Sequence, residues 1–213
     1  LPTTVAGGLI PELIPMVHAR YPHIRLHVVE AMSGVLKEQL HLGRLDLAVL
    51  FDTAPLTGLR CTPLLTEPIF LLLPTNHPCA TLAAIDLSHL ASLALMLPSR
   101  ANSIRNHLEQ ACKAQGLELA VLADVDSLPG LLGLVRCGYC TVLPKYLAKR
   151  DIDAGHIAAV AIANPALEWE LHLATRRDAP RPRANVAVSE SLIEACDALI
   201  KRGDWEAQIR WQA

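Results

Sequence analysis

The chain has 213 residues and a formal net charge of −2, and 52% of its residues are hydrophobic, 19% charged and 4% aromatic. This composition allows a sizeable aliphatic core and disfavours a disordered chain. It also argues against nucleic-acid binding by these residues alone, because phosphate contacts need clustered Lys and Arg. No apolar run approaches the roughly 18 residues of a membrane span, so we expect no membrane partner.

The cysteines indicate the compartment. Six of them are scattered without obvious pairing, and the sequence has no Asn-x-Ser/Thr glycosylation site. A cytoplasmic protein with free thiols fits this pattern. The chain starts at Leu1 rather than at a methionine, so we expect a piece of a longer protein whose upstream domain or signal peptide is missing.

Local patterns predict alternating helices and strands in the first part of the chain. Apolar residues at helical spacing predict a helix over 5–20, and polar–apolar alternation predicts a half-buried strand over 23–28. Ser33 is expected to cap a second helix, which ends at Gly43. The continuous apolar run 46–51 is typical of a strand covered on both faces. This order predicts a parallel sheet and an α/β fold.

The alternation continues after a turn-rich stretch at 57–60. One helix is expected to follow the polar turn 99–103, another to begin at Ser127, and the last to surround Leu192. After Gly203 the chain is expected to be either a short amphipathic helix or a frayed terminus. The strands expected in this part are 69–73, 93–97, 119–125, 141–143, 157–162 and 169–175.

Short hydroxyl, amide and carboxylate side chains stand at three expected helix starts, where an open α/β sheet binds its ligands. Unpaired backbone N–H groups and the helix dipole make each start a potential anion site, to which Arg100 adds charge. The alternative is that Thr4, Ser103 and Ser127 only cap their helices. The ligand interpretation requires the turns to face each other, and both interpretations stay open. The three starts are Thr3 with Thr4, the turn 99–103, and Asp126 with Ser127.

The search for catalytic chemistry is mostly negative. The sequence lacks a nucleotide-binding glycine loop, a zinc-protease helix and a nucleophile elbow. Its nine histidines are spread out, and His23 and His27 suggest a solvated strand face rather than a metal pair. Cys137 and Cys140 have redox or zinc spacing, but they end a helix instead of opening one, and no second pair accompanies them. We therefore expect no enzyme, no metal and no cofactor.

Six pieces of sequence stand in a distinctive order: ARYPHIRL at 19–26, GRLDLAV at 43–49, PLLTEP at 63–68, HP at 77–78, SL at 127–128 and GYCTVLP at 138–144. Together they resemble the effector-binding (substrate-binding) domain of LysR-type transcriptional regulators. Residues 32–34, 97–100 and 126–129 look closest to the nitrogen assimilation control branch of that family. Cys140 departs from the family pattern, because a glycine or a small aliphatic residue is commoner there.

The resemblance implies a periplasmic-binding-protein-like α/β fold of type 2, with two Rossmann-like subdomains joined by two crossover strands. The crossover strands would form a hinge, and a small molecule shifts such a hinge only by binding one closure state better. The family's N-terminal winged helix-turn-helix is not among these residues. The expected boundaries are 1–73 plus 172–201 for subdomain I, 74–171 for subdomain II and 202–213 for a C-terminal tail, with crossovers near 69–73 and 169–175.

The resemblance also implies a function. The chain would sense a small anionic effector between its lobes and would self-associate as a dimer or tetramer, and DNA would bind only through the missing N-terminal domain. The first helix, around Leu13 and Val17, is a candidate interface. An outcome in which no effector is needed stays open. Carried over by position, the effector-binding residues are Thr3, Thr4, Ser33, Phe51, Ser99, Arg100, Asn102, Ser103, Asp126 and Ser127, with Gly138 or Tyr139 closing one side.

Two other classes of protein are built from similar lobes and are therefore alternatives. A free-standing solute-binding receptor would need an export signal and an oxidising periplasm, and six unpaired cysteines count against the latter. An enzyme of the porphobilinogen deaminase type would need a cofactor-bearing cysteine in a third domain, which this chain does not contain. The upstream sequence discriminates between the regulator and the receptor.

Overall fold

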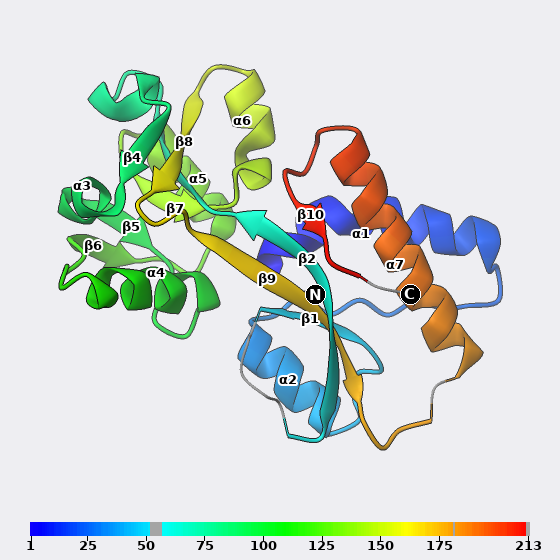
Figure 1. Ribbon diagram of the computed structural model, residues 1–213. Helices are drawn as coiled ribbons and strands as arrows, with labels where there is room; N and C mark the ends of the chain where they lie inside the picture. Colours follow the sequence, from blue (N-terminus) through cyan, green and yellow to red (C-terminus); the bar gives the residue numbers. More distant parts are fainter. Residues whose placement is uncertain (52–56, 181, 212–213) are drawn as a thin grey trace. The chain divides into compact units, whose positions relative to one another are not determined.

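The computed structural model describes residues 1–51, 57–180 and 182–211 of an α/β chain (Figure 1). The chain divides into two compact units, one of Leu1–Thr66 with Glu170–Ala213 and the other of Glu67–Trp169. The chain thus passes between the units after Thr66 and after Trp169, whereas the sequence placed these passages after residues 73 and 171. The segment expected as a separate tail belongs to the first unit.

The first unit is built on a sheet of strand order β1-β9-β2-β10. β1 pairs antiparallel with β9, with Leu50 opposite His172, so the expectation of a parallel sheet is wrong here. That expectation assumed that strands close in sequence pair with each other, and β1 instead pairs with a strand near the end of the chain. The strands are β1 (Ala48–Phe51), β2 (Leu59–Pro68), β9 (Glu168–Arg176) and β10 (Gln208–Ile209).

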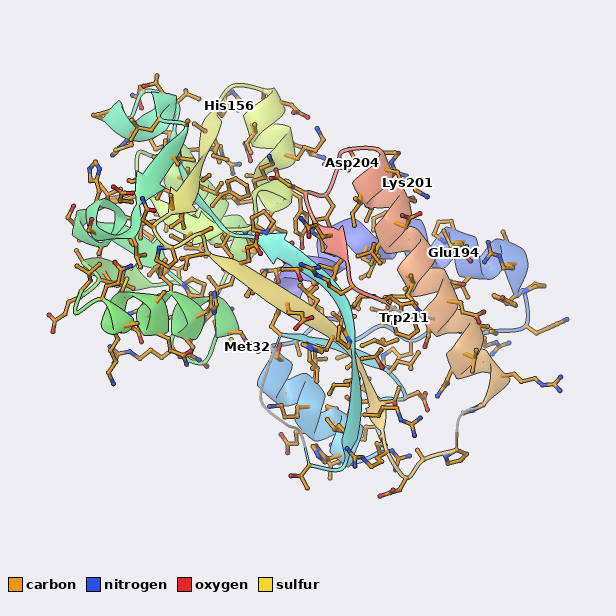
Figure 2. All side chains as sticks on the ribbon, in the orientation of Figure 1. Met32, His156, Glu194, Lys201, Asp204 and Trp211 are labelled. Atoms are coloured by element: carbon orange, nitrogen blue, oxygen red, sulfur yellow. The ribbon has the colours of Figure 1, made fainter. Side chains whose placement is uncertain are left out.

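Helix α2 (Ser33–His41) covers one face of this sheet. Its Leu36 and Leu40 pack against Ala48, Leu50 and Ala174. The N-cap of α2 is Met32, which makes no side-chain cap, so the prediction that Ser33 is the cap is wrong by one residue (Met32 is labelled in Figure 2).

Helices α1 (Thr3–Arg20) and α7 (Arg183–Lys201) pack against each other. Arg20 forms a 2.7 Å ion pair with Glu194, which is labelled on α7 in Figure 2. Leu13 and Val17 are only 4% and 1% exposed, because they face the interior of the unit. These two side chains therefore cannot form the interface expected from the sequence.

Three further expectations fail in the first unit. Residues 23–28 form neither a helix nor a strand, because alternation provides an apolar face but no partner strand pairs with it. β2 was missed because Pro63 and Pro68 interrupt its pattern. The segment after Gly203 forms β10 with a buried Trp205, not a helix or a frayed end, because it pairs with β2.

The second unit has two sheets. In the larger one, of order β4-β8-β3-β7, β3 pairs antiparallel with both β7 and β8 while β4 lies parallel to β8. The smaller one pairs β5 and β6 in parallel. The strands are β3 (Phe70–Pro74), β4 (Ala84–Asp86), β5 (Leu95–Leu97), β6 (Val121–Asp124), β7 (Thr141–Leu143) and β8 (Ile157–Ala163).

The parallel pair of β5 and β6 positions two helix starts. Helix α4 (Ser103–Ala114) follows β5, and helix α5 (Leu128–Arg136) follows β6 (Figure 1). Because parallel strands end at the same sheet edge, both helix N-termini begin there. Among the described residues, no helix is both long and apolar enough to cross a membrane. The remaining helices are α3 (Leu87–Ser92) and α6 (Lys149–Asp153), with 3-10 turns at Pro78–Thr81 and Lys145–Ala148.

Candidate functional site

In the second unit, the turns after β5 and β6 are joined by a hydrogen bond. The backbone N–H of Ser99 donates to Oδ1 of Asp126 at 2.9 Å. The turn 99–103 and the pair Asp126 and Ser127 therefore lie together, as the ligand interpretation requires for this half of the site. Tyr139 also lies in the second unit, whereas Thr3, Thr4, Ser33 and Phe51 belong to the first, and these candidates are described separately.

The helix caps in this cluster differ from those expected. Asn102 caps α4, since its Oδ1 accepts from the N–H of Ile104 at 2.9 Å. Ser103 is the first residue of α4 and not its cap. Ser127 does cap α5, accepting from the N–H of Gly130 at 3.2 Å. An added Cβ at Gly130 would lie 3.1 Å from the Ser127 side chain, so this close approach suits glycine.

A buried arginine that the sequence analysis missed holds the cluster together. Arg105 is 4% exposed, and its Nε donates to Glu109 at 2.7 Å. Its Nη1 donates to Asp124 at 3.1 Å and to the carbonyl of Pro98 at 3.4 Å. Arg105 thus links α4 to the ends of both β5 and β6. The arginine–glutamate spacing of four residues was the one signal in the sequence that pointed to it.

The charged side chains of this cluster have a net negative formal charge, with two arginines against three carboxylates. Arg100 is 77% exposed and pairs with Glu109 at 3.2 Å, which partly neutralises the charge expected to attract an anion. Desolvation alone would raise the pKa of Glu109, but the hydrogen bonds from Arg105 and Arg100 outweigh it, and that pKa is lowered. Since Asp124 and Asp126 add two more carboxylates, anion binding here depends on helix N–H groups.

In the first unit, Thr3 and Thr4 are the first two residues of α1. The N-cap is Pro2, and no side chain caps this helix. Thr4 is 8% exposed, so it is neither a cap nor a solvated side chain. The N–H groups of Val5 and Ala6 donate to the carbonyl of Pro2, each at 2.9 Å, and the N-cap supplies no side-chain acceptor, so the N–H groups of Thr3 and Thr4 are the ones that an anion at this helix start would use.

Ser33 and Phe51 are brought together by a hydrogen bond. The backbone N–H of Phe51 donates to Oγ of Ser33 at 3.3 Å, which ties the start of α2 to the end of β1. Phe51 is 7% exposed, so its ring mainly fills the interior. Phe51 directly precedes residues 52–56, which fall outside the described part of the chain.

His172 is a polar residue on β9 that no sequence pattern indicated. Its side chain is 12% exposed, and Nε2 lies 3.5 Å from Oε2 of Glu170. Its Nδ1 is buried and has no hydrogen-bond partner, which is uncommon for a native polar atom. In the ladder between β1 and β9, His172 lies opposite Leu50, which directly precedes Phe51.

Tyr139 and the neighbouring cysteines follow helix α5. Tyr139 is 39% exposed, and its backbone N–H donates to the carbonyl of Leu134 at 3.1 Å. The preceding Gly138 has φ 106°, which suits glycine. Cys137 is exposed and Cys140 is buried, and both thiols are free. Desolvation, followed by the influence of Cys79, raises the pKa of Cys140 to about 11, so this thiol is a poor nucleophile. Among the described residues, no group of three or more His, Cys, Asp or Glu is arranged to hold a metal.

Comparison with known proteins identifies the family. The LysR substrate binding domain matches residues 1–197, and the chain belongs to this family. The match confirms the resemblance found in the sequence, and with it the periplasmic-binding-protein-like α/β fold.

Two curated relatives are transcriptional regulators. The chain is 33% identical over 199 residues to the HTH-type transcriptional regulator BbuR of Bordetella bronchiseptica, covering 92% of this chain and 61% of that protein. It is 27% identical over 194 residues to the nitrogen assimilation regulatory protein nac of Klebsiella aerogenes, covering 90% and 62%. The chain therefore spans about three-fifths of the length of these relatives. The relatives are named as regulators and not as enzymes, as expected.

A solved structure supports the fold independently. The regulatory domain of reduced OxyR from Pseudomonas aeruginosa superposes with a TM-score of 0.76 at 26% identity, covering 91% of this chain and 94% of that one. Nearly the whole of this chain therefore corresponds to one regulatory domain.

Proposed function

We propose that this chain is the effector-sensing and oligomerisation domain of a DNA-binding transcriptional regulator. The observation that carries the proposal is the Ser99–Asp126 hydrogen bond, which brings the starts of α4 and α5 together in a LysR substrate binding domain. Such convergent helix starts at a sheet edge form ligand sites in α/β proteins. The names of the two curated relatives support the regulatory role.

The proposed effector is a small metabolite with at least one anionic or strongly hydrogen-bond-accepting group. Two helix starts support this chemistry in different ways. The uncapped start of α1 offers N–H donors at Thr3 and Thr4. Around the starts of α4 and α5, three carboxylates outnumber Arg100 and Arg105, which favours a ligand of low net charge over a multiply charged anion. The proposed contacts are Thr3, Thr4, Ser33, Phe51, Ser99, Arg100, Asn102, Ser103, Asp126, Ser127 and Tyr139.

In this proposal, the effector binds through the candidate residues that each unit carries. A ligand that binds one arrangement of the two units better than another shifts their equilibrium by its difference in affinity. DNA contacts would come from the part of the protein outside these residues. We further propose self-association as a dimer or tetramer and a cytoplasmic location.

Thermal melting with a panel of small carboxylates and amino acids tests the proposal. A ligand present at 100 times its dissociation constant stabilises the folded state by about 2.7 kcal/mol. We expect Thr4→Ala and Ser103→Ala to weaken the shift, and Ser88→Ala, at an exposed position of α3, to leave it unchanged. If no compound shifts the melt and both variants still regulate normally, the candidate residues bind no effector and the sensing role is wrong.

The free-standing solute receptor that the sequence left open is not supported, because the chain belongs to the LysR substrate binding domain family and its curated relatives are named as regulators. The upstream gene sequence provides a further test. A helix-turn-helix there supports the regulator, and an export signal there would contradict it.

A further inference from the structure

The first unit carries a local cluster of arginines that the net charge of −2 does not reveal. The cluster lies where β9 ends and β2 begins, and these two strands are neighbours in the sheet (Figure 1). Its members come from three separate stretches of the chain, so no short piece of sequence shows it. The arginine cluster consists of Arg44, Arg60, Arg176, Arg177 and Arg183.

Hydrogen bonds at the strand ends bring two members of the arginine cluster together. The backbone N–H of Arg177 donates to the carbonyl of Gly58 at 2.9 Å. Its Nη2 donates to the carbonyl of Leu59 at 3.5 Å. Because Arg60 directly follows Leu59, Arg177 and Arg60 are neighbours across the two strand ends.

The other members lie around the last residue of β9. Nη1 of Arg176 lies 3.1 Å from the position that a Cβ on Gly43 would take, and Arg44 directly follows Gly43. Arg176 also lines a small cavity together with Pro182, the N-cap of α7. Arg183 is the first residue of that helix, so it begins beside Arg176.

The positive charge of the arginine cluster is not compensated within the first unit. All five arginines are exposed, and none of them forms an ion pair with another residue that the structure describes. Asp46 and Asp178 are the only carboxylates within two residues of a member. By contrast, Arg136 and Arg202 pair with carboxylates at 2.9 and 2.7 Å. Because like charges repel, the cluster does not stabilise the fold, and an anionic partner would supply the missing countercharge.

The chemistry of arginine indicates which anion fits. The planar guanidinium donates two parallel hydrogen bonds to phosphate, and its charge is permanent. Duplex DNA carries one negative charge per about 1.7 Å of its axis, so several arginines spread over two strand ends and a helix start can contact phosphates together. An acidic protein surface mixes carboxylates with cations and offers a lower charge density. Contacts to phosphates position a protein without reading the base sequence.

We propose that the arginine cluster contacts the phosphate backbone of duplex DNA. This sequence-independent contact adds to the DNA contacts made by the part of the protein outside these residues. The choice of DNA rests on the regulatory role proposed above, since a curated relative is named as an HTH-type transcriptional regulator. The sequence analysis argued against nucleic-acid binding because it found no clustered Lys and Arg, and tertiary structure assembles the cluster.

Fluorescence anisotropy tests the proposal, with this chain titrated into a labelled duplex of roughly 20 base pairs. We expect saturable binding with a dissociation constant near about 10⁻⁵ M at low salt, and equal affinity for a second duplex of unrelated sequence. Four phosphate contacts give a slope of roughly −3.6 for the logarithm of the binding constant against that of the salt concentration. A threefold rise in salt should therefore weaken binding about fiftyfold.

The double variant Arg60→Gln with Arg176→Gln removes two charges from the arginine cluster. It should make the salt slope less steep by about 1.8 and weaken binding at low salt by about tenfold or more. Its melting temperature should not fall, because the cluster is self-repelling. The matched control is Lys113→Gln with Arg150→Gln, which removes the same charge from exposed positions of the second unit and should keep the full slope.

Three outcomes would each overturn the proposal. The first is no saturable binding up to about 10⁻⁴ M protein at low salt. The second is an equal loss of binding in the control variant. The third is tighter binding to polyglutamate than to the duplex, which would indicate an acidic protein as the partner. If the first double variant does not fold, Arg44→Gln with Arg183→Gln takes its place. Effector sensing is measured separately by the melting shift, so failure here leaves the proposed function intact.

Discussion

The indole N–H of Trp169 donates a 2.7 Å hydrogen bond to Oε1 of Glu67. Trp169 is 7% and Glu67 only 1% exposed. Burial of a carboxylate is unfavourable, and the hydrogen bond from the indole offsets part of that desolvation cost. Glu67 and Trp169 are the first and last residues of the second unit. This hydrogen bond therefore joins the two strands at the points where the chain enters and leaves that unit.

Trp169→Phe should destabilise the protein by about 1–3 kcal/mol, because it removes a donor from a buried carboxylate. Urea unfolding measures the loss. Glu67→Gln keeps an acceptor oxygen and should cost less than Trp169→Phe. Trp211→Phe, at a half-buried position, serves as the tryptophan control. Equal stability of Trp169→Phe and the unaltered protein would show that this hydrogen bond contributes nothing net.

Arg105→Met should destabilise the second unit by about 1–3 kcal/mol, because the substitution leaves Glu109 and Asp124 without their buried partner. The cost stays below that of a fully buried pair, since Asp124 is 55% and Glu109 30% exposed and water can solvate both. Arg100→Gln is the control, because its ion pair is mostly exposed and should contribute less than about 1 kcal/mol. Chemical denaturation of both variants checks the ranking, and a larger loss for Arg100→Gln would contradict it.

Ser127→Ala separates the capping role of this residue from a role in binding. Loss of the N-cap of α5 should cost about 1 kcal/mol, and Ser127→Thr should retain most of it. If Ser127 also contacts the effector, Ser127→Ala weakens effector binding beyond its effect on stability. A melting shift by the effector that is identical in the two variants would leave Ser127 as a cap only.

Acid should destabilise the protein through three ion-paired glutamates. A hydrogen bond from Arg202 lowers the pKa of Glu12, and one from Arg20 lowers the pKa of Glu194, each below the usual 4.5. Glu109 is lowered as well. Because the folded-state pKa values are depressed, these pairs stabilise the fold fully above pH 4.5, and the contribution is lost as the pH falls through the lower folded values.

Unfolding free energies measured between pH 6 and 3 test this dependence. Each glutamate-to-glutamine variant should lose part of the acid-dependent slope. Glu190→Gln, an exposed glutamate on α7, is the control and should keep the full slope. An unchanged slope in all three variants would contradict the prediction.

Local sequence patterns were sufficient for much of the helical structure. The spacing of Leu9, Leu13 and Val17 predicted α1, and Ser127 marked the start of α5, because helix periodicity and capping act within a few residues. The family pattern was also legible in short pieces such as residues 43–49, which the family match confirms. The turns 99–103 and 126–127 were recognised for the same local reason.

Contacts between residues far apart in the chain could not be predicted from local patterns. The neighbouring sequence does not show which distant residue each of these groups contacts. The pairs are Leu50 opposite His172, Arg105 with Asp124, and Glu67 accepting from Trp169. Sheet pairing and buried ion pairs are stabilised by groups far apart in sequence, and only packing determines which of many compatible partners meet. For the same reason, the alternation over residues 23–28 predicted a strand that does not form, since no neighbouring strand pairs with it. Strand β2 forms in spite of its two prolines, because it pairs with both β9 and β10.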